Sequence, residues 1–153
     1  MAEQLPNIVD GKEQVARIIF SPSYICNGRV APTAFRWEVL PSGDVEDYIS
    51  VLRGSTDSLS QQSRHFRART EGDSRYGYAL MRVADIRNVG KGNLLIDELY
   101  VDVRAFPSKA HPNHAGIEAT IYGNKITAFS PITPEIMMLQ KSLAMLCSDI
   151  VKF

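Results

Sequence analysis

Two histidines stand three residues apart in the segment His111-Pro-Asn-His114, and they are the side chains best suited to acid–base chemistry. An imidazole has an ordinary pKa of about 6.5, so it can take up and release a proton near neutral pH. His114 directly precedes an expected strand and is therefore fixed in position, which makes it the first candidate for a catalytic acid or base. His111 is the weaker candidate, because it belongs to a proline-rich loop.

The same two imidazoles could share a metal ion on one face of a helix, but Pro112 opposes a regular helix and the zinc pattern H-E-x-x-H is missing. A metal site would need ligands from elsewhere, for which the candidates are His65, Glu98, Asp102, Glu118 and the two cysteines. The pair Gly90 and Gly92 is too short for a nucleotide-binding loop and indicates a turn. We predict neither a metal site nor a bound cofactor.

The segment from residue 54 to residue 75 is rich in Ser, Gln, Thr and Arg and poor in large apolar side chains, which predicts a polar loop or insertion. Arg and aromatic side chains together can hold phosphates and stack on bases. The candidates for binding an anion or nucleic acid are Arg64, Arg67, Arg69, Arg75 and Tyr76. The alternative is a solvent-exposed polar loop, because Glu71 and Asp73 dilute the positive charge.

Serine or cysteine nucleophiles have less support, because the chain lacks a G-x-S-x-G elbow. Cys26 and Cys147 have apolar neighbours and no partner at metal-binding spacing. We expect buried free thiols, with a disulfide as the alternative, and this expectation favours a reducing cytoplasm. The acidic residues of segment 44–47 are interpreted as a solvated turn, since the ligand spacing of a calcium loop is absent.

Length and charge limit the class of protein. A chain of 153 residues corresponds to one domain, 1–153, and residues 1–7 look like a loose tail. Its formal net charge of +0 gives no global field of the kind that marks a dedicated nucleic-acid binder, so any such binding is local. The start of the chain lacks the features of a signal peptide, and no apolar run approaches the length of a membrane span. We therefore expect a cytoplasmic protein with no membrane partner.

Strands are predicted wherever apolar and β-branched residues alternate with polar ones. In segment 94–103 Leu99, Val101 and Val103 share one face, and in segment 116–122 Ile117 and Ala119 do so. A hairpin at residues 88–93 is expected to connect segment 94–103 to segment 79–86, and Gly123-Asn124 is expected to turn the chain into 125–129. Two further strands are expected at 34–40, where Phe35, Trp37 and Val39 alternate, and at 48–52.

Three helices are considered. Asp10 can cap a helix over 11–17, although 15–20 can instead form an opening strand, and Asp57 or Ser58 can cap a helix over 59–67 with Arg64 and Arg67 on one face. The clearest helix begins at Thr133-Pro134-Glu135, with an apolar stripe that covers one face of the sheet. The stripe consists of Ile136, Leu139, Leu143, Leu146 and Ile150. Met138 and Met145 widen it, which favours a larger internal core over a contact with a partner subunit.

The chain is thus expected to be an α+β domain with a mainly antiparallel sheet of about five to seven strands and a C-terminal helix on one face. We expect an accessory or interaction domain, a subunit of a bacterial-type multi-protein system, with a protein partner or a homo-oligomer. The alternative is a small enzyme for phosphoester cleavage or nucleotide transfer on nucleotides or nucleic acid. A pocket joining His114 to Arg64, Arg67 or Arg75 would favour the enzyme; a flat apolar surface beside the last helix would favour the interaction domain.

Overall fold

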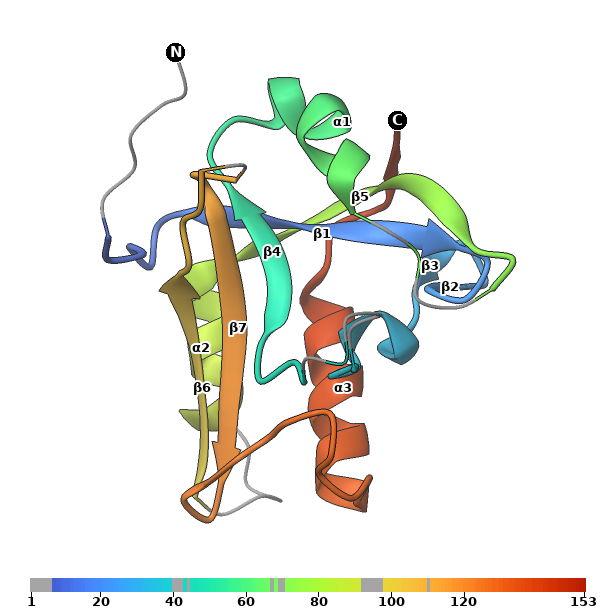
Figure 1. Ribbon diagram of the computed structural model, residues 1–153. Helices are drawn as coiled ribbons and strands as arrows, with labels where there is room; N and C mark the ends of the chain where they lie inside the picture. Colours follow the sequence, from blue (N-terminus) through green and yellow to red (C-terminus); the bar gives the residue numbers. More distant parts are fainter. Residues whose placement is uncertain are drawn as a thin grey trace.

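A seven-stranded sheet organises the chain, and every strand pair in it is antiparallel. The computed structural model describes residues 7–39, 43, 45–66, 68, 71–91, 98–109 and 111–153. The strand order is β6-β7-β4-β1-β5-β9, with β8 on β7 (Figure 1). The strands are β1 (Gln14–Ser21), β4 (Ile49–Arg53), β5 (Ser74–Arg82), β6 (Leu99–Ala105), β7 (His114–Ile121), β8 (Asn124–Lys125) and β9 (Val151–Lys152). The α+β prediction is confirmed.

Helical segments and a small second sheet complete the fold. In Figure 1, α2 lies behind β6 and β7, α3 runs beneath β1, and α1 lies above it. The helices are α1 (Leu59–Gln62), α2 (Val83–Lys91) and α3 (Pro134–Leu146), with 3-10 turns η1 (Pro32–Phe35), η2 (Thr56–Ser58) and η3 (Ser63–His65). The two-stranded sheet pairs β2 (Ile25–Cys26) with β3 (Arg29–Val30). No helix among the described residues is long and apolar enough to cross a bilayer.

The period-two pattern of β6 and β7 is confirmed. Leu99, Val101 and Val103 are buried, while Tyr100 between them is exposed. Their partners on β7 are buried on the same face, because Val103 stands opposite Ile117 in the register. This face joins the single large core under α2 and α3, and the opposite face of the two strands carries polar side chains.

The C-terminal helix α3 begins as predicted and ends earlier. The hydroxyl oxygen of Thr133 accepts a hydrogen bond from the backbone N–H of Ile136, at 3.3 Å, and Pro134 takes the first helical position. The helix ends at Leu146, so Ile150 lies beyond it. The reason is a competing strand: the N–H of Ser148 donates to the carbonyl of Leu80 at 2.9 Å, which draws the chain onto β5 as β9.

The predicted strand over 79–86 is correct as far as Arg82, where β5 ends, and wrong beyond it, because α2 occupies Val83–Lys91. The helix also replaces residues 88–91 of the predicted hairpin, whose last two residues, 92 and 93, lie outside the described residues. The N–H of Val83 donates to the carbonyl of Glu13 and that of Ala84 to Gly11, both at 3.0 Å. These bonds satisfy two donors that a helix start leaves unpaired. They come from a distant segment, which the local pattern cannot reveal. The first part of the predicted strand 94–103 lies outside the described residues.

The predicted strand over 34–40 is also wrong where it is described. Pro32 starts the 3-10 helix η1, which packs against α3 and buries Phe35. Trp37 is buried too, whereas Val39 is exposed and only bridges to Val45. Phe35 and Trp37 are both buried although neither belongs to a strand, and their spacing of two residues produces the strand-like pattern.

The turn before β8 lies one residue earlier than predicted. Tyr122 and Gly123 have positive φ angles of 51° and 78°, as a two-residue hairpin turn requires. The returning strand is correspondingly short, since β8 contains only Asn124 and Lys125 rather than 125–129.

At the start of the chain the strand alternative is correct, because β1 begins at Gln14 and replaces the helix over 11–17. Asp10 and Glu13 still bond reciprocally: the N–H of Asp10 donates to the Glu13 carboxylate at 2.7 Å, and the N–H of Glu13 donates to the backbone carbonyl of Asp10 at 3.0 Å. The capping pattern therefore closes a turn.

The helix predicted over 59–67 is broken into short turns, η2, α1 and η3, that reach His65. Its cap is Ser55, whose hydroxyl accepts from the N–H of Asp57 at 3.2 Å, while Ser58 makes no capping bond. Arg67 and Arg69 lie outside the described residues, so the predicted face shared by Arg64 and Arg67 is not described.

Candidate functional site

A pocket opens where β1 and β4 diverge. The two strands pair only through Val15 with Arg53 and Ala16 with Leu52. Beyond these pairs the side chain of Arg17 bridges the gap, because its Nη1 donates to the carbonyl of Ser50 at 2.8 Å and its Nε to the carbonyl of Ala34 at 2.9 Å. The Arg17 side chain thus makes a hydrogen bond to β4 that the backbone of a paired strand would otherwise make.

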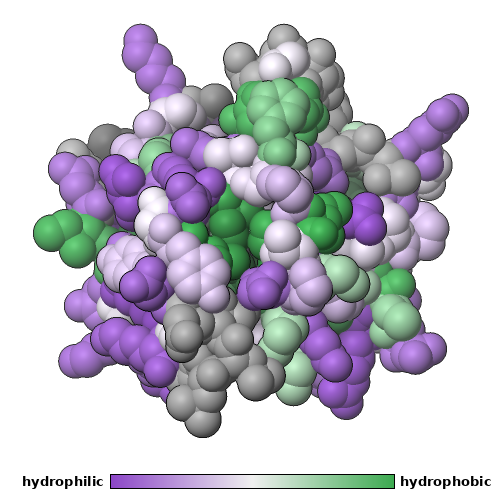
Figure 2. Space-filling view, turned by 90° about the horizontal axis from the view of Figure 1, so that it is seen from below, coloured by the Kyte–Doolittle hydropathy of each residue, from purple (hydrophilic) through white to green (hydrophobic). Residues whose placement is uncertain are grey.

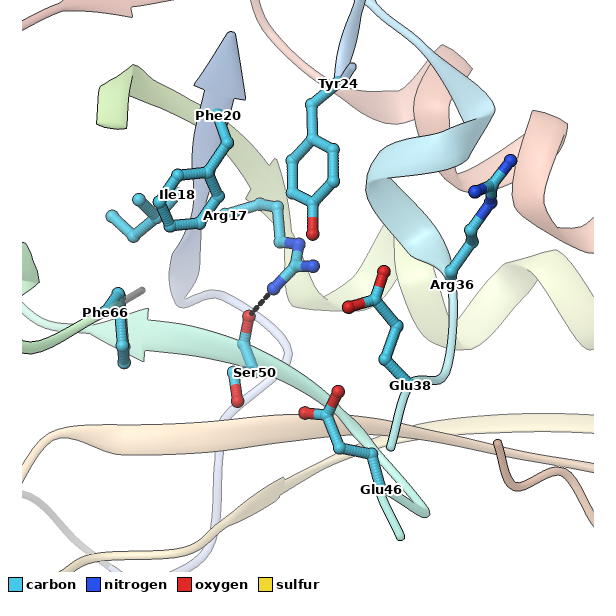
Figure 3. Close-up of a pocket in the computed structure, with 9 residues that line it drawn as sticks. All are labelled: Arg17, Ile18, Phe20, Tyr24, Arg36, Glu38, Glu46, Ser50 and Phe66. Atoms are coloured by element: carbon cyan, nitrogen blue, oxygen red, sulfur yellow. Dashed lines mark hydrogen bonds between the residues drawn. The ribbon is translucent and has the colours of Figure 1, made fainter. Parts of the chain in front are cut away.

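The pocket has mixed charge and aromatic walls (Figure 3). The pocket is shallow, because the empty volume of about 420 Å³ around its lining residues includes open solvent. The Tyr24 hydroxyl, the Arg17 guanidinium and the Glu38 carboxylate face the same space, while Arg36 points away from the centre. The lining residues are Arg17, Ile18, Phe20, Tyr24, Arg36, Glu38, Glu46, Ser50 and Phe66.

Ser50 connects the pocket to His114. The Nε2 atom of His114 lies 3.1 Å from the Ser50 hydroxyl, and its Nδ1 atom lies 3.1 Å from the carbonyl oxygen of Phe106. A carbonyl only accepts hydrogen bonds, so Nδ1 carries the proton of the neutral ring. Nε2 then accepts a hydrogen bond from the Ser50 hydroxyl. This is the arrangement of a nucleophile, a base and a group that orients the base.

The environment keeps His114 neutral. Burial lowers the pKa of its imidazole, the bond to the Phe106 carbonyl raises it, and the nearby His111 lowers it, with a net result below the ordinary value of 6.5. At neutral pH the ring is therefore a proton acceptor, which is the form that a general base needs.

Aromatic packing holds the His114 ring in place. Tyr48 and Phe106 stack with ring centroids 4.6 Å apart, and Tyr48 meets the His114 ring edge-on at 5.7 Å. The stack lies directly over Gly116, where an added Cβ would come within 2.7 Å of Tyr48 and 2.9 Å of Phe106. A glycine is therefore needed for the rings to lie flat on β7 and for the Phe106 carbonyl to reach His114.

The residue before His114 is anchored from the other side. The side-chain amide of the buried Asn113 donates to the backbone carbonyl of Arg53 at 2.8 Å and to the side-chain oxygen of Gln62. The backbone carbonyl of Asn113 in turn accepts a hydrogen bond from the backbone N–H of Arg53 at 2.9 Å. Arg53 is 2% exposed and pairs through two nitrogens with both carboxylate oxygens of Glu13, each at 2.9 Å. This ion pair fixes the end of β4 and hence the loop that delivers His114.

The predicted site residues fall in different places. His111 stacks on Phe66 at 5.5 Å and so lies behind a wall of the pocket. Arg75 donates to the Ser60 carbonyl at 3.0 Å and to the Ser63 hydroxyl at 3.1 Å, so its guanidinium connects β5 to the turns α1 and η3. The ring of Tyr76 lies under Lys152, and Arg64 is exposed. Within the described chain, none of the lining residues of the pocket comes from the predicted arginines.

Sequence reasoning missed three groups at the site, Arg17, Arg36 and Ser50. A signal was present for two of them, because Arg17 and Ser50 each interrupt an apolar strand with a polar side chain. Nothing in the spacing indicates that residues 33 positions apart would meet.

The cysteines and the carboxylates offer no further centre. Cys26 is exposed on β2, so the expectation of a buried thiol is wrong there, and Cys147 is half-buried; both are free. Burial raises the pKa of the Cys147 thiol to about 12, against a smaller lowering by Arg17, which keeps the thiol protonated and unreactive. Among the described residues, no group of three His, Cys, Asp or Glu side chains could hold a metal ion.

A second surface feature lies at the start of α3. Phe129, Ile132 and Met137 are exposed by 73%, 72% and 57%, and we call these residues the α3-start surface. Figure 2 views this end of the molecule and shows apolar side chains gathered near its middle among hydrophilic ones.

Comparisons of the chain with protein-family models, with curated proteins and with solved structures found no significant match. The chemistry of the two surface features therefore carries the functional argument.

Proposed function

We propose that the protein is a small enzyme that acts on phosphoesters of nucleotides or nucleic acid. The observation that supports this proposal is the hydrogen bond between the Ser50 hydroxyl and His114 Nε2 at the wall of a pocket that contains arginine. In this reaction Ser50 is the nucleophile and His114 is the general base and acid.

The reaction has two steps. Ser50 Oγ attacks the phosphorus while its proton passes to His114 Nε2; the bond from phosphorus to the leaving oxygen breaks, and that oxygen takes the proton from His114. Water then attacks the phosphoserine, gives a proton to His114 and releases the phosphate product, and the proton returns to Ser50 Oγ. The Phe106 carbonyl keeps the imidazole in the required tautomer throughout.

Arg17 supplies the fixed positive charge. Two of its guanidinium nitrogens donate to backbone carbonyls, which hold the group rigidly beside Ser50, and its remaining N–H groups face the pocket. A preorganised donor is most effective where negative charge develops on the phosphoryl oxygens. Arg36 lies at the rim and suits the more distant part of an anionic substrate.

The proposal is tested by turnover of a panel of nucleotides, short single-stranded RNA and DNA, and an activated phosphodiester. Wild-type protein should release product from at least one of them, and Ser50→Ala should abolish the release. The matched control is Ser60→Ala, which removes a hydroxyl from an exposed serine outside the pocket lining and should keep full activity. Activity that is equal in wild type and Ser50→Ala, or no turnover across the panel, would contradict the proposal.

We also propose an interaction role for the α3-start surface, where a protein partner or a second copy of the chain would cover apolar side chains. The observation that favours it is the adjacent exposure of Phe129 and Ile132. Sedimentation at increasing concentration, and in host extract, should detect a complex that Ile132→Ser weakens. Met145→Ser is the control, because Met145 is as exposed but lies near the other end of α3. A complex that survives Ile132→Ser would exclude this surface.

A further inference from the structure

The turns η2, α1 and η3 depend on polar contacts for their position. Leu59 is their one apolar side chain, and it is buried in the core. From β5, Arg75 donates to the Ser60 carbonyl at 3.0 Å and to the hydroxyl of the fully buried Ser63 at 3.1 Å. A segment that buries so little apolar surface opens easily when such bonds are lost.

The same arginine rests on the aromatic ring that follows β9. The guanidinium of Arg75 lies over the Phe153 ring, 5.1 Å from its centroid, which is a cation–π contact. Phe153 is held in turn by β5, because its N–H donates to the Tyr76 carbonyl at 3.1 Å and its ring packs against Tyr78 at 5.9 Å. Arg75 therefore joins β9 to α1 and η3 (Figure 1).

The other side of these turns meets the loop of His114. The side-chain oxygen of Gln62 accepts a hydrogen bond from the amide of the buried Asn113, which directly precedes His114. Phe66, directly after η3, stacks on His111 with ring centroids 5.5 Å apart. The turns α1 and η3 thus stand between β9 and the loop that carries both histidines.

The docking of β9 is both close and lightly held. A Cβ built at Gly77 would lie 2.1 Å from the carbonyl oxygen of Val151 and 3.0 Å from the Cα of Lys152, so any side chain at this position would displace β9. The side chains of β9 are exposed, and its two residues pair only with Gly77 and Tyr78. Short exposed strands of this kind are among the first parts of a fold to open.

We propose that Arg75 is a positioning residue of the site and that β9 is a strap: when β9 is docked, Arg75 holds α1 and η3 against the loop of His114 and so keeps His114 beside Ser50. When β9 leaves β5, Arg75 loses the ring beneath it, and the turns loosen together with their bond to Asn113. The expected effect on turnover rests on the proposed function, whereas the expected effect on the histidine rings does not.

The test is nitrogen NMR of the histidine-labelled full chain, with turnover measured on the same preparations. Gly77→Ala should displace β9 directly, since the atoms nearest to the added Cβ all belong to that strand. Arg75→Met keeps an unbranched side chain and removes the donors. Both variants should shift the imidazole signals of His111 and His114, and the titration midpoint of His114 should rise toward 6.5 as its burial decreases. Turnover should fall about 10- to 100-fold, as expected when a catalytic group is misplaced.

Lys152→Ala is the matched control, because it removes a side chain of β9 that lies over Tyr76 and leaves the contact of Arg75 with Phe153 in place. It should keep the wild-type signals and turnover. Phe153→Ala, at a position that is 41% exposed, removes only the ring under Arg75 and decides the question if Gly77→Ala fails to fold. Unchanged histidine signals in the folded variants, or a shift of equal size in Lys152→Ala, would overturn the inference.

The two readouts separate this inference from the proposed function. Histidine shifts in a protein that shows no Ser50-dependent turnover would support the strap and contradict the enzyme. Ser50-dependent turnover that Gly77→Ala and Arg75→Met leave unchanged would support the enzyme and contradict the positioning role of Arg75.

Discussion

The two ends of β4 each place a polar side chain in an apolar strand, but the surroundings differ. At Arg53 the strand is paired with β1, the guanidinium is buried, and Glu13 meets it with two bonds. At Ser50 the strands have diverged and the residue lines a pocket, while its hydroxyl lies against the imidazole of His114, which is neutral and bonded to the Phe106 carbonyl. The ion pair of Arg53 stabilises the fold, whereas the Ser50–His114 pair is the one to which we assign the proposed chemistry. Variants at the two ends should therefore separate stability from activity.

The largest effect is expected at the open end. His114→Ala removes the proposed base and should lower turnover about 10²- to 10⁴-fold, the usual contribution of general acid–base catalysis. His111→Ala is the matched control, because His111 stacks on Phe66 and does not line the pocket itself, and this variant should cost less than about 10-fold in turnover. Steady-state kinetics on the substrate found in the panel measure both. An equal loss in the two variants would indicate that His114 acts only through packing.

At the closed end the effect should fall on stability. Glu13→Gln removes the carboxylate that binds the buried guanidinium of Arg53 through two oxygens, and it should lower the free energy of unfolding by about 3 kcal/mol. Urea denaturation measures this loss. The activity per folded molecule should stay within about threefold of wild type, because Asn113 still bonds to the Arg53 backbone. A selective loss of activity with unchanged stability would remove the distinction between the two ends.

A substitution at Gly116 should affect both quantities moderately. Gly116→Ala inserts a Cβ under the stacked rings of Tyr48 and Phe106, and such overpacking costs about 1–3 kcal/mol. Displacement of Phe106 also moves the carbonyl that orients His114, so turnover should fall as well. Thermal unfolding and kinetics on one preparation provide the comparison, and an unchanged Tm would show that the rings do not rest on β7 as described.

The smallest effects are expected from pH, and they differ between the two ends. The folded pKa of His114 lies below 6.5, so turnover should persist to a pH below 6.5 before protonation stops it. The unfolded chain takes up that proton first, so stability should fall as pH drops from 6.5 to the folded pKa and then level off.

Glu13 responds at lower pH. Burial raises the pKa of its carboxyl, but the hydrogen bonds from Arg53 and from the backbone of Asp10 outweigh burial and leave it below 4.5. Its contribution to stability is therefore present above pH 4.5 and is lost as pH falls through the folded pKa. Denaturation curves at several pH values should show that wild type loses stability in this acidic range and that Glu13→Gln does not show this part of the loss. An identical pH dependence of stability in wild type and variant would contradict the role of the Glu13 carboxylate.

Local patterns in the sequence predicted the elements that local forces determine. Thr133 caps α3 and the alternation around Val101 defines β6, because both depend on neighbours in the chain. The apolar run through Val83 fits a strand as well as a helix, and the carbonyls of Gly11 and Glu13, which accept hydrogen bonds from the first N–H groups of α2, decide between them. The pocket was beyond prediction for the same reason. His114 could be found because a strand fixes it, whereas its partner Ser50 lies on another strand and is identified only by the fold.

The protonation state of His114, measured by nitrogen NMR of histidine-labelled protein at neutral pH, tests the proposed reaction most directly. The hydrogen bonds of His114 predict a neutral ring with its proton on Nδ1, a titration midpoint below pH 6.5, and a change at Nε2 in Ser50→Ala. A ring that carries its proton on Nε2, or that is charged at neutral pH, could not accept the proton of Ser50 and would contradict the proposed reaction.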